Sequence, residues 1–466
     1  MGMEMKTEEK RCDCDVAIVG GGSAGYAAAR TAAAGGLRVV LIEGEEEVGG
    51  LCILRGCMPT KSMLYAAEMM HLAGKMGRWG IGVGEVGFEF EEVMKRKDAF
   101  VEGLAEYRRG QIADGAFDFI RGEAKFADAH RVVVAGYGEV RARHFILATG
   151  SSPASSRTEG LDEVGYLTSD DAVGLKALPK SLIILGGGAV AVEFAQFFGR
   201  FGVEVTLVQR SEHVLSDVDV DAAEVVEKVF RREGIRVLTG TEVVRAEMGE
   251  GGKRICFRQD GEERWVEAEE ILLAQGRVAN TAGLELERAW VDVEKGRILM
   301  NEFLQTSVSH IFAAGDCASL YKVVHLAVKQ GEVAGWNAAK PEEMRKSDER
   351  LAMSIVFTEP QVASVGLTEK EAEKQGVEVV VARYAFADHG KAVLMEATDG
   401  FVKLLADAGT GEILGGACVG PHGGELIHEI VVAMAKRMTV RELAEVPHYH
   451  PTLAEIWTYP AEELVG

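Results

Sequence analysis

The chain has 466 residues, of which 47% are apolar and 27% are charged. This balance is typical of a soluble globular enzyme, and the length predicts two to four domains. The 51 basic and 73 acidic residues leave a net charge of −22, which argues against nucleic acids and anionic membranes as partners.

The first residues, MGMEMKTEEKRCDCD, are polar and acidic and lack the apolar run of a signal peptide. No run of about 18 apolar residues follows, so we expect a cytoplasmic protein without a membrane span. The seven scattered cysteines do not suggest a disulfide-rich scaffold. Two further metal ligands are not placed near Cys12 and Cys14, so we expect no metal site there.

Residues 15–43 predict a strand, a glycine-rich turn, a helix and a second strand. The first strand is the apolar run Val16–Val19. The turn has the spacing G-x-G-x-x-G, formed by Gly20, Gly22 and Gly25. Glycines let the backbone approach a pyrophosphate, and the helix N-terminus then offers free N–H groups. Glu43 ends the second strand and can accept both hydroxyls of an adenosine ribose, so we expect a dinucleotide site.

The segment GGLCILRGCMPTK, residues 49–61, contains Cys52 and Cys57. As a structural disulfide, so short a loop would contribute only about 2 kcal/mol, and a zinc site would need a second pair of ligands. Redox chemistry is the remaining interpretation. Pro59 fits the first turn of a helix, so Cys57 would lie at the helix N-terminus, where the dipole favours the thiolate.

Residues 181–210 repeat the strand, turn and helix of the first dinucleotide site. The glycine positions are now taken by Gly186, Gly188 and Ala191. At the place of Glu43 stands Gln209, followed by Arg210, which can pair with a ribose 2′-phosphate. We therefore expect NADPH over NADH, although Arg210 could also be a solvated loop residue. The two sites differ in the residue that would contact the adenosine ribose, which suggests two different cofactors, a hydride carrier and a flavin.

The cysteine segment meets the pattern GGxCxxxGCxPxK through Gly49, Gly50, Cys52, Gly56, Cys57, Pro59 and Lys61. Further motifs contain Ala148, Thr149 and Gly150; Gly276 and Arg277; Ala313, Gly315 and Asp316; and His450 and Glu455. Over nearly its whole length the sequence resembles the class I pyridine nucleotide-disulfide oxidoreductases, the family of dihydrolipoamide dehydrogenase, glutathione reductase and mercuric reductase.

The resemblance implies an α/β fold with two Rossmann-like dinucleotide-binding domains, for FAD and NAD(P), and a C-terminal α+β dimerisation domain. The expected ranges are 1–152 and 279–350 for the FAD and central region, 153–278 for NAD(P) and 351–466 for dimerisation. It also implies a homodimer whose subunits share each active site.

The same resemblance implies that electrons pass from NADPH through FAD and a Cys52–Cys57 disulfide to a small disulfide or dithiol substrate. Cys57 would face the flavin and form the charge-transfer thiolate, while Cys52 would exchange with substrate. His450 of the other subunit would be the acid-base catalyst, oriented by Glu455. The resemblance also implies a pair of residues beside the flavin N5, which would be Lys61 and Glu193.

The motifs and the resemblance together assign the cofactor contacts. FAD would contact Gly20, Gly22, Ser23, Ala24, Gly25, Glu43, Gly50, Cys52, Lys61, Ala124, Thr149, Gly150, Arg277, Asp316 and His325. NADP would contact Gly186, Gly188, Ala189, Val190, Ala191, Glu193, Gln209, Arg210 and Gly276. Ala124 would contact the adenine through its backbone, and helix capping is the alternative role for His325.

Several residues bear on the substrate. Arg30 and Ser23 match residues of glutathione reductase that touch glutathione, although both are also common in such helices and turns. Arg55 and Leu51 depart from the family pattern, and Ala189 replaces a tyrosine that often covers the nicotinamide pocket.

Three hypotheses stay open. The leading one is an NADPH-dependent flavoprotein disulfide reductase. The second is an NAD-linked dihydrolipoamide dehydrogenase, which Gln209 disfavours. The third is a non-catalytic flavoprotein for redox sensing or partner binding. Mercuric reductase chemistry is disfavoured because no C-terminal cysteine pair follows the His450 motif.

Overall fold

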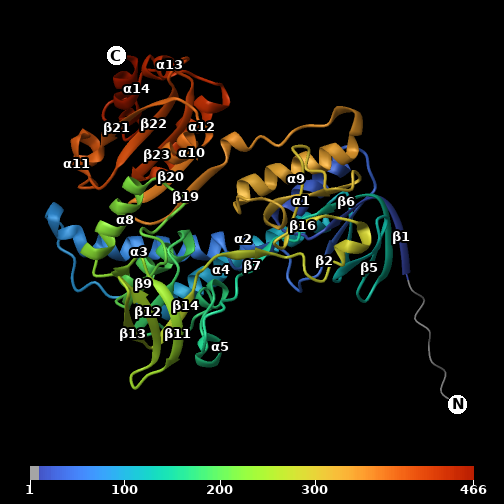
Figure 1. Ribbon diagram of the computed structural model, residues 1–466, viewed down its shortest axis with the longest axis horizontal. Coiled ribbons are helices and arrows are strands. Elements are labelled where there is room, and N and C mark those ends of the chain that lie inside the picture. The colour runs from blue at the N-terminus through green and yellow to red at the C-terminus, as the bar shows by residue number, and fades with distance from the viewer. Residues whose placement is uncertain (1–9) are drawn as a thin grey trace. The chain divides into compact units, whose positions relative to one another are not determined.

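The computed structural model describes residues 10–466 (Figure 1). Contacts divide the chain into two compact units. The first unit contains the residues up to Thr60, Arg96–Pro153 and Arg277–Glu349. The second unit contains Lys61–Lys95, Ala154–Gly276 and Arg350–Gly466. The four domain ranges expected from the sequence remain predictions.

A seven-stranded sheet forms the core of the first unit, in the order β3-β2-β1-β6-β5-β4 with β18 beside β6. Its strands are β1 (Lys10–Val19), β2 (Val39–Glu43), β3 (Asp118–Arg121), β4 (Ala124–Asp128), β5 (Arg131–Val134), β6 (Gly138–Leu147) and β18 (Ile311–Ala313). β1 pairs in parallel with β2 and β6, β3 pairs in parallel with β2, and β18 pairs in parallel with β6. β5 pairs antiparallel with both β4 and β6. All five residues of β2 are buried, as the apolar runs of a parallel sheet require.

β1 is longer than the predicted strand Val16–Val19. It starts at Lys10, and its extra residues pair with β6, with Cys12 opposite Val140. A backbone ladder does not require apolar side chains, so hydropathy alone missed this part of the strand.

α1 (Ser23–Ala34) and α9 (Val324–Ala339) lie side by side in the first unit (Figure 1). A Cβ at Gly331 would lie 2.2 Å from the carbonyl oxygen of Ala24, and one at Gly335 would lie 2.6 Å from that of Ala28. Glycine on one helix and alanine on the other therefore allow the close packing that holds the start of α1.

The cysteine segment contains α2 (Gly50–Leu54) and the start of α3 (Cys57–Lys75), and α4 (Phe90–Ala113) follows. Residues 151–153 form a short strand that was not predicted: β7 (Ser151–Pro153) pairs antiparallel with β15 (Arg277–Ala279). So short a strand has no hydrophobic period that a sequence could display.

The second unit contains a parallel sheet in the order β10-β9-β8-β14. Its strands are β8 (Ser181–Leu185), β9 (Glu204–Val208), β10 (Arg236–Leu238) and β14 (Glu270–Leu273). An antiparallel sheet is made of β11 (Glu242–Met248), β12 (Lys253–Gln259) and β13 (Glu262–Ala268). The helices α7 (Ala189–Arg200) and α8 (Val220–Arg232) repeat the strand-turn-helix order of the first unit.

The C-terminal part of the second unit contains an antiparallel sheet in the order β19-β20-β23-β22-β21. Its strands are β19 (Met353–Val356), β20 (Gln361–Gly366), β21 (Val379–Ala385), β22 (Phe401–Asp407) and β23 (Ile413–Gly420). Its helices are α10 (Glu369–Gln375), α11 (Gly390–Leu394), α12 (Gly423–Ala435), α13 (Val440–Ala444) and α14 (Thr458–Val465). The shorter elements elsewhere are α5 (Leu161–Val164), α6 (Ser169–Ala172), β16 (Val293–Glu294), β17 (Arg297–Ile298) and single turns of 3₁₀ helix.

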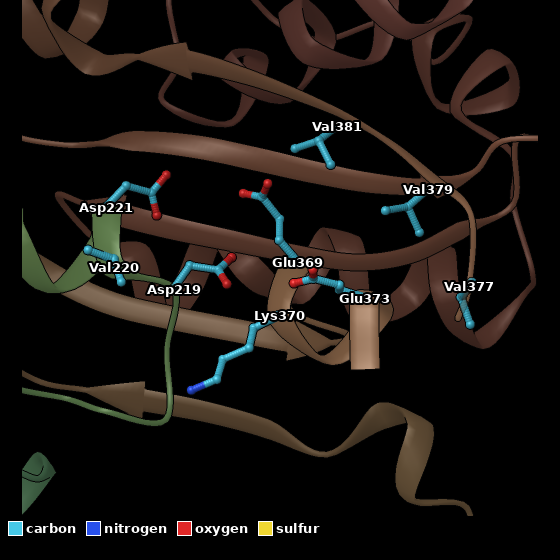
Figure 2. Close-up of a pocket in the computed structure, with 9 residues that line it drawn as sticks. All are labelled: Asp219, Val220, Asp221, Glu369, Lys370, Glu373, Val377, Val379 and Val381. Atoms are coloured by element: carbon cyan, nitrogen blue, oxygen red, sulfur yellow. The ribbon is translucent and has the colours of Figure 1, made fainter. Parts of the chain in front are cut away.

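A buried lysine joins α8, α10 and β22. Lys403 is 2% exposed, and its Nζ lies 3.1 Å from Asp219, 2.8 Å from Asp221 and 2.6 Å from Glu369. These carboxylates also line a cavity of about 710 Å³ together with Lys370 (Figure 2). Burial disfavours the charge of Lys403, but hydrogen bonds to the carboxylates outweigh burial and raise its pKa. The cavity contains none of the predicted site residues, so we assign the cluster to stability.

Replacing Lys403 with methionine should destabilise the protein by about 1–3 kcal/mol, because it leaves the partly buried carboxylates of Asp219 and Asp221 without their cation. The measurement is the midpoint of thermal unfolding. Since the folded-state pKa of Lys403 is raised, this contribution is fully present below the usual lysine pKa of about 10.4 and is lost as the pH rises through the folded value. Lys370→Met, at an exposed lysine of the same cavity, is the control and should change stability by about 0.5 kcal/mol or less. Equal effects of the two substitutions would contradict this assignment.

Candidate active site

The first glycine turn joins β1 to α1 in a conformation that only glycine tolerates. Gly20 has φ +104°, and a Cβ there would lie 2.4 Å from the carbonyl oxygen of Ala148. Gly22 is the N-cap residue of α1, so the turn places the helix N-terminus beside the end of the strand. The backbone N–H groups of that N-terminus fit a pyrophosphate.

Glu43 lies under this turn at the end of β2, as predicted. Its Oε2 accepts a hydrogen bond from the Gly21 N–H at 2.8 Å, and its Oε1 accepts one from the Glu45 N–H at 3.0 Å. Glu43 is 8% exposed. The backbone N–H groups of the turn and of Glu45 therefore hold the Glu43 carboxylate in place.

The second turn repeats the first in the other unit. Gly186 has φ +126°, and a Cβ there would lie 2.3 Å from the carbonyl oxygen of Ala274. Gly188 is the N-cap residue of α7. The side chain of Gln209 packs under Gly187, where a Cβ would lie 2.8 Å from Gln209 Cδ. The repeated backbone geometry fits a second pyrophosphate, with an amide where the first turn has the carboxylate.

The remaining predicted NADP contacts surround this second turn. Ala189 and Val190 begin α7 and are exposed, whereas Ala191 is buried. Arg210 is exposed and follows Gln209, whose Oε1 accepts a hydrogen bond from the Arg210 N–H at 3.1 Å. The last, Gly276, has φ +111° and begins the turn back to the first unit.

Four predicted FAD residues of the first unit meet around Ser151. The Ser151 hydroxyl donates to Asp316 Oδ2 at 2.6 Å and accepts from Arg277 Nε at 2.9 Å. Thr149 donates through its hydroxyl to the Asn280 carbonyl at 2.6 Å, and Gly150 O accepts from the Asn280 N–H at 3.0 Å. These bonds hold Asp316 beside the backbone of Thr149 and Gly150.

Gln330 supports the same motif and was missed in the sequence. It is 0% exposed, and its Oε1 accepts a hydrogen bond from the Gly315 N–H at 2.8 Å. A lone glutamine among the apolar residues of α9 was the available signal. Its partner could not be inferred, because the contact forms between separate elements.

The cysteine segment begins two helices. Cys52 lies in α2, and Cys57 is the first residue of α3, which confirms its predicted place at a helix N-terminus. Both cysteines are partly buried. A Cβ at Gly50 would lie 2.7 Å from the Cα of Gly22, so the segment packs directly against the first dinucleotide turn. The structure thus brings the cysteine motif to the turn that fits a flavin dinucleotide.

Lys61 and Glu193 form the predicted pair. Lys61 Nζ lies 2.8 Å from Glu193 Oε2 and 3.0 Å from Oε1. Oε1 also accepts from the Phe357 N–H at 2.9 Å, and Nζ lies 4.7 Å from the centre of the Phe357 ring. Glu193 is 3% exposed, so its charge is matched by Lys61 and by the backbone.

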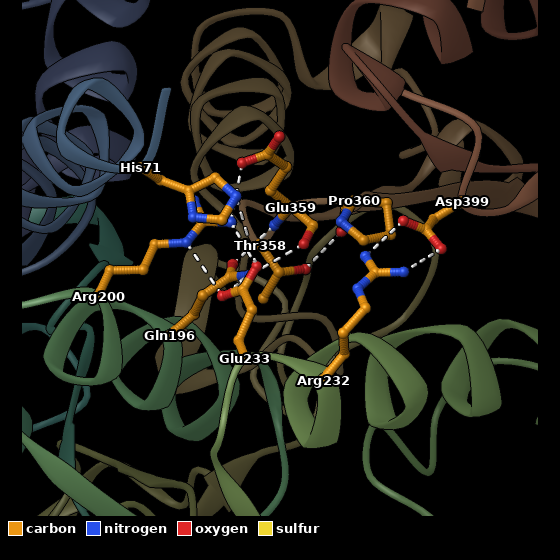
Figure 3. Close-up of polar contacts among 9 residues, drawn as sticks. All are labelled: His71, Gln196, Arg200, Arg232, Glu233, Thr358, Glu359, Pro360 and Asp399. Carbon is orange, nitrogen blue, oxygen red and sulfur yellow. Dashed lines mark hydrogen bonds and ion pairs between the residues drawn. The ribbon is translucent and has the colours of Figure 1, made fainter. Parts of the chain in front are cut away.

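The polar face of α7 continues beyond Glu193 to Gln196 and Arg200 (Figure 3). These two residues were not predicted from the sequence. Gln196 exchanges two hydrogen bonds with the backbone of Glu359, at 2.7 and 2.9 Å. Arg200 binds Glu233 at 2.9 Å and Glu359 at 2.8 Å. Glu193, Gln196 and Arg200 are three and four residues apart, so one helix face holds the segment before β20.

His450 and Glu455 form the second predicted pair. His450 Nδ1 lies 3.0 Å from Glu455 Oε2. The His450 side chain is 76% exposed and that of Glu455 is 10% exposed. A buried carboxylate therefore orients an accessible imidazole, as acid-base catalysis requires. The neighbouring His448 contacts Glu429 Oε1 through Nε2 at 2.6 Å.

The other predicted residues of the first unit have fewer informative contacts. Arg30 is exposed on α1 and lies 3.9 Å from Glu332. Arg55 follows α2, with Nη2 at 3.4 Å from Glu45. His325 is an exposed residue in the first turn of α9. The small residues Ser23, Ala24 and Gly25 begin α1, and buried Ala124 begins β4.

Cys14 does not have the environment of a reactive thiol. Burial, with a further contribution from Cys12, raises the pKa of Cys14 to about 12.

Within residues 10–466 we find no group of three or more histidine, cysteine or acidic residues placed to hold a metal ion. No helix in the same range is both long and apolar enough to cross a membrane.

Residues 14–331 match the family model for pyridine nucleotide-disulphide oxidoreductases, and residues 352–461 match the dimerisation domain of that family. The chain belongs to this family. Its members bind FAD and use NAD(P)H, so the predicted family, fold class, enzyme class and cofactors are confirmed. The dimerisation domain supports a homodimer.

Two curated relatives illustrate the range of the family. The chain is 34% identical to dihydrolipoyl dehydrogenase of Bacillus subtilis, over 95% of this chain and 96% of the relative. It is also 34% identical to mercuric reductase of Staphylococcus aureus, over 95% of this chain and 81% of the relative. Relatives of equal similarity thus carry different names, so identity alone does not define the substrate.

Solved structures show the same fold. The HOCl-induced flavoprotein disulfide reductase RclA from Escherichia coli has a TM-score of 0.85 at 27% identity, covering 96% of this chain and 99% of RclA. LpdA from Mycobacterium tuberculosis has a TM-score of 0.87 at 28% identity, covering 97% of this chain and 99% of LpdA. The similarity to these structures thus extends over nearly the whole chain.

The two turn glycines should have separable effects. Gly20→Ala should yield protein with little FAD, measured by flavin absorbance per protein, because the new Cβ collides with a backbone carbonyl. Gly186→Ala should retain FAD and lose turnover with the nicotinamide nucleotide. Gly103→Ala, on α4 with no atom within 4 Å of the new Cβ, is the control and should retain both. A full complement of FAD in purified Gly20→Ala would show that the first turn does not hold the flavin.

Proposed function

We propose that this enzyme reduces a small disulfide with electrons from NADPH. The observation that carries the proposal lies at the second dinucleotide turn. Its backbone repeats the first turn, but Gln209 and Arg210 replace the carboxylate of Glu43. An amide does not repel a ribose 2′-phosphate, and the exposed guanidinium of Arg210 can bind it through charge-assisted hydrogen bonds.

FAD, when bound, supplies the two-electron chemistry that links the nicotinamide to the cysteine pair. The chain's part begins with binding. The N-termini of α1 and α7 offer N–H groups to the two pyrophosphates, and Glu43 offers its carboxylate to an adenosine ribose. Asp316 is assigned to the ribityl chain, and the pair Lys61 and Glu193 to the neighbourhood of the flavin N5.

The cysteine pair carries the exchange with substrate. In the reduced enzyme the Cys52 thiolate attacks one sulfur of the substrate, whose S–S bond breaks, and the first departing sulfur takes a proton from His450. The Cys57 thiolate then attacks Cys52 and releases the second sulfur, which takes a proton from water. The substrate gains the two electrons that the cysteine pair loses in forming its disulfide. The helix N-terminus at Cys57 stabilises the attacking thiolate.

His450 is suited to move the proton. Because Nδ1 donates to Glu455, the exposed ring leaves Nε2 as the atom that exchanges protons. Since the dimerisation domain supports a homodimer, we propose that each cysteine pair is served by His450 of the partner subunit.

The NAD-linked dihydrolipoamide dehydrogenase hypothesis stays open as the second candidate. The similarity to the Bacillus subtilis dihydrolipoyl dehydrogenase favours it. Gln209 opposes it, because a carboxylate at that position would bind the free ribose hydroxyls of NAD. A comparison of the two nucleotides in one turnover assay distinguishes the candidates.

Arg210→Ala should raise the KM for NADPH by about 10- to 100-fold, the equivalent of a charge-assisted hydrogen bond of about 1.5–3 kcal/mol. The KM for NADH should stay unchanged, because NADH lacks the 2′-phosphate. Gln209→Glu should also weaken the binding of NADPH and strengthen that of NADH. Steady-state kinetics with both nucleotides checks this, and Arg236→Ala, at an exposed arginine of β10, is the control. A wild-type preference for NADH would contradict the nucleotide assignment.

Cys57→Ser should retain FAD and lose disulfide turnover by at least about 100-fold, because the thiolate that regenerates the internal disulfide is absent. Titration of the wild type with NADPH should produce a long-wavelength charge-transfer absorption band, which the variant should lack. Cys14→Ser tests for general effects of cysteine removal and should behave as wild type. Wild-type rates in Cys57→Ser would overturn the disulfide-reductase assignment.

A further inference from the structure

A second histidine lies behind the His450–Glu455 pair. His389 is 0% exposed, and its Nε2 lies 3.5 Å from Glu455 Oε1. His450 binds the other oxygen, Oε2, at 3.0 Å. The carboxylate therefore lies between an exposed imidazole on one side and a buried imidazole on the other.

The ring of His389 has no hydrogen bond of its own. Within residues 10–466 neither of its ring nitrogens has a hydrogen-bond partner, and the contact with Glu455 is an ion-pair distance at the outer limit of a hydrogen bond. Buried polar groups in native proteins are almost always satisfied, so such an exception calls for an explanation. Hydrogen bonds of catalytic groups are often long before substrate binds and shorten in the productive complex.

The surroundings hold His389 in this place. It precedes α11, and its N–H donates to the Phe386 carbonyl at 3.1 Å while its carbonyl accepts from the Val393 N–H at 3.0 Å. The ring meets Phe386 and Tyr459 edge to face, with centroids 6.5 and 6.2 Å apart. Both the backbone and the aromatic contacts therefore aim the imidazole at Glu455.

We propose that His389 is a positioning residue, which donates a hydrogen bond from Nε2 to Glu455 and holds that carboxylate against His450. The acid-base unit then has three members, His450, Glu455 and His389. This inference deepens the proposed function and rests on it, because His450 acts on the sulfur that leaves during disulfide exchange.

A neutral imidazole suits this role. Burial lowers the pKa of His389; Glu455 opposes that effect, and His450 adds to it. His389 is then an uncharged donor near neutral pH, so it holds Glu455 without neutralising it, and the carboxylate keeps its attraction for a protonated His450. Tyr459 of α14 also faces His389, and Tyr384 of β21 stacks on Tyr459 with the ring centroids 4.1 Å apart.

The test compares His389→Leu with His389→Gln in the full-length flavoprotein. The two replacements have similar volumes, and only glutamine carries an N–H donor at the reach of Nε2. Disulfide turnover with NADPH should fall on the order of tenfold in the leucine variant, a part of the roughly 10²- to 10⁴-fold that acid-base catalysis supplies. The glutamine variant should recover most of the rate.

Two further readouts separate positioning from a merely structural role. In the leucine variant the alkaline limb of kcat against pH should move to lower pH, because a displaced Glu455 stabilises the imidazolium of His450 less. Turnover of NADPH with ferricyanide, which bypasses the cysteine pair, should stay unchanged. His144→Leu removes a partly buried histidine, whose Nδ1 also lacks a hydrogen-bond partner, and should leave the pH profile unchanged.

Equal rates and equal pH profiles in the leucine and glutamine variants would overturn the role of His389. So would a loss of ferricyanide turnover that equals the loss of disulfide turnover. A wild-type enzyme that reduces ferricyanide but no disulfide would instead overturn the proposed function, and with it this inference.

The tautomer of His389 in the wild-type enzyme provides a further test. In ¹⁵N-histidine NMR, His389 should appear as the neutral Nε2–H tautomer at pH 7, with its signals assigned by their absence from the spectrum of His389→Gln. An Nδ1–H tautomer would overturn the proposal, because the nitrogen that faces Glu455 would then carry no proton.

Discussion

The close contact between a glycine and the carbonyl of a neighbouring strand is the constraint on which both nucleotide sites depend. A Cβ at Gly20 would lie 2.4 Å from the carbonyl oxygen of Ala148, and one at Gly186 would lie 2.3 Å from that of Ala274. No side chain fits into either contact. The strand can therefore turn directly into a helix whose N-terminus faces the place of a pyrophosphate, and the chain builds this device twice.

Around these turns the structure places polar groups where their charges are matched. The face of α7 shows this best, since the buried carboxylate of Glu193 binds Lys61, and Arg200, whose side chain is 7% exposed, binds two carboxylates. Buried charges of this kind persist only when partners surround them. The helix that starts at the second turn is thereby tied to the segment before β20 and to the start of the long helix that follows Cys57.

Local signals allowed much of the site to be predicted. The glycine spacing, the residue that closes the second strand and the proline after Cys57 all act within one or two turns of chain. His450 and Glu455 were also recognised, since both belong to one short motif of the family that the sequence resembles. Other features could not be predicted, because they join distant elements: Gln196 meets Glu359 across 163 residues. The strand pairing of β7 with β15 is another example, since three residues carry no periodic signal.

The sequence by itself determined the family, the two dinucleotide turns, the helix start at Cys57 and the exchange of Glu43 for Gln209, because each depends on the identity and spacing of nearby residues. Only the tertiary structure decided which groups surround them. The Lys61–Glu193 pair spans 132 residues, and His389 reaches Glu455 because β21 and the C-terminal segment pack together. Burial and orientation arise when distant segments meet, and no local pattern of residues encodes them.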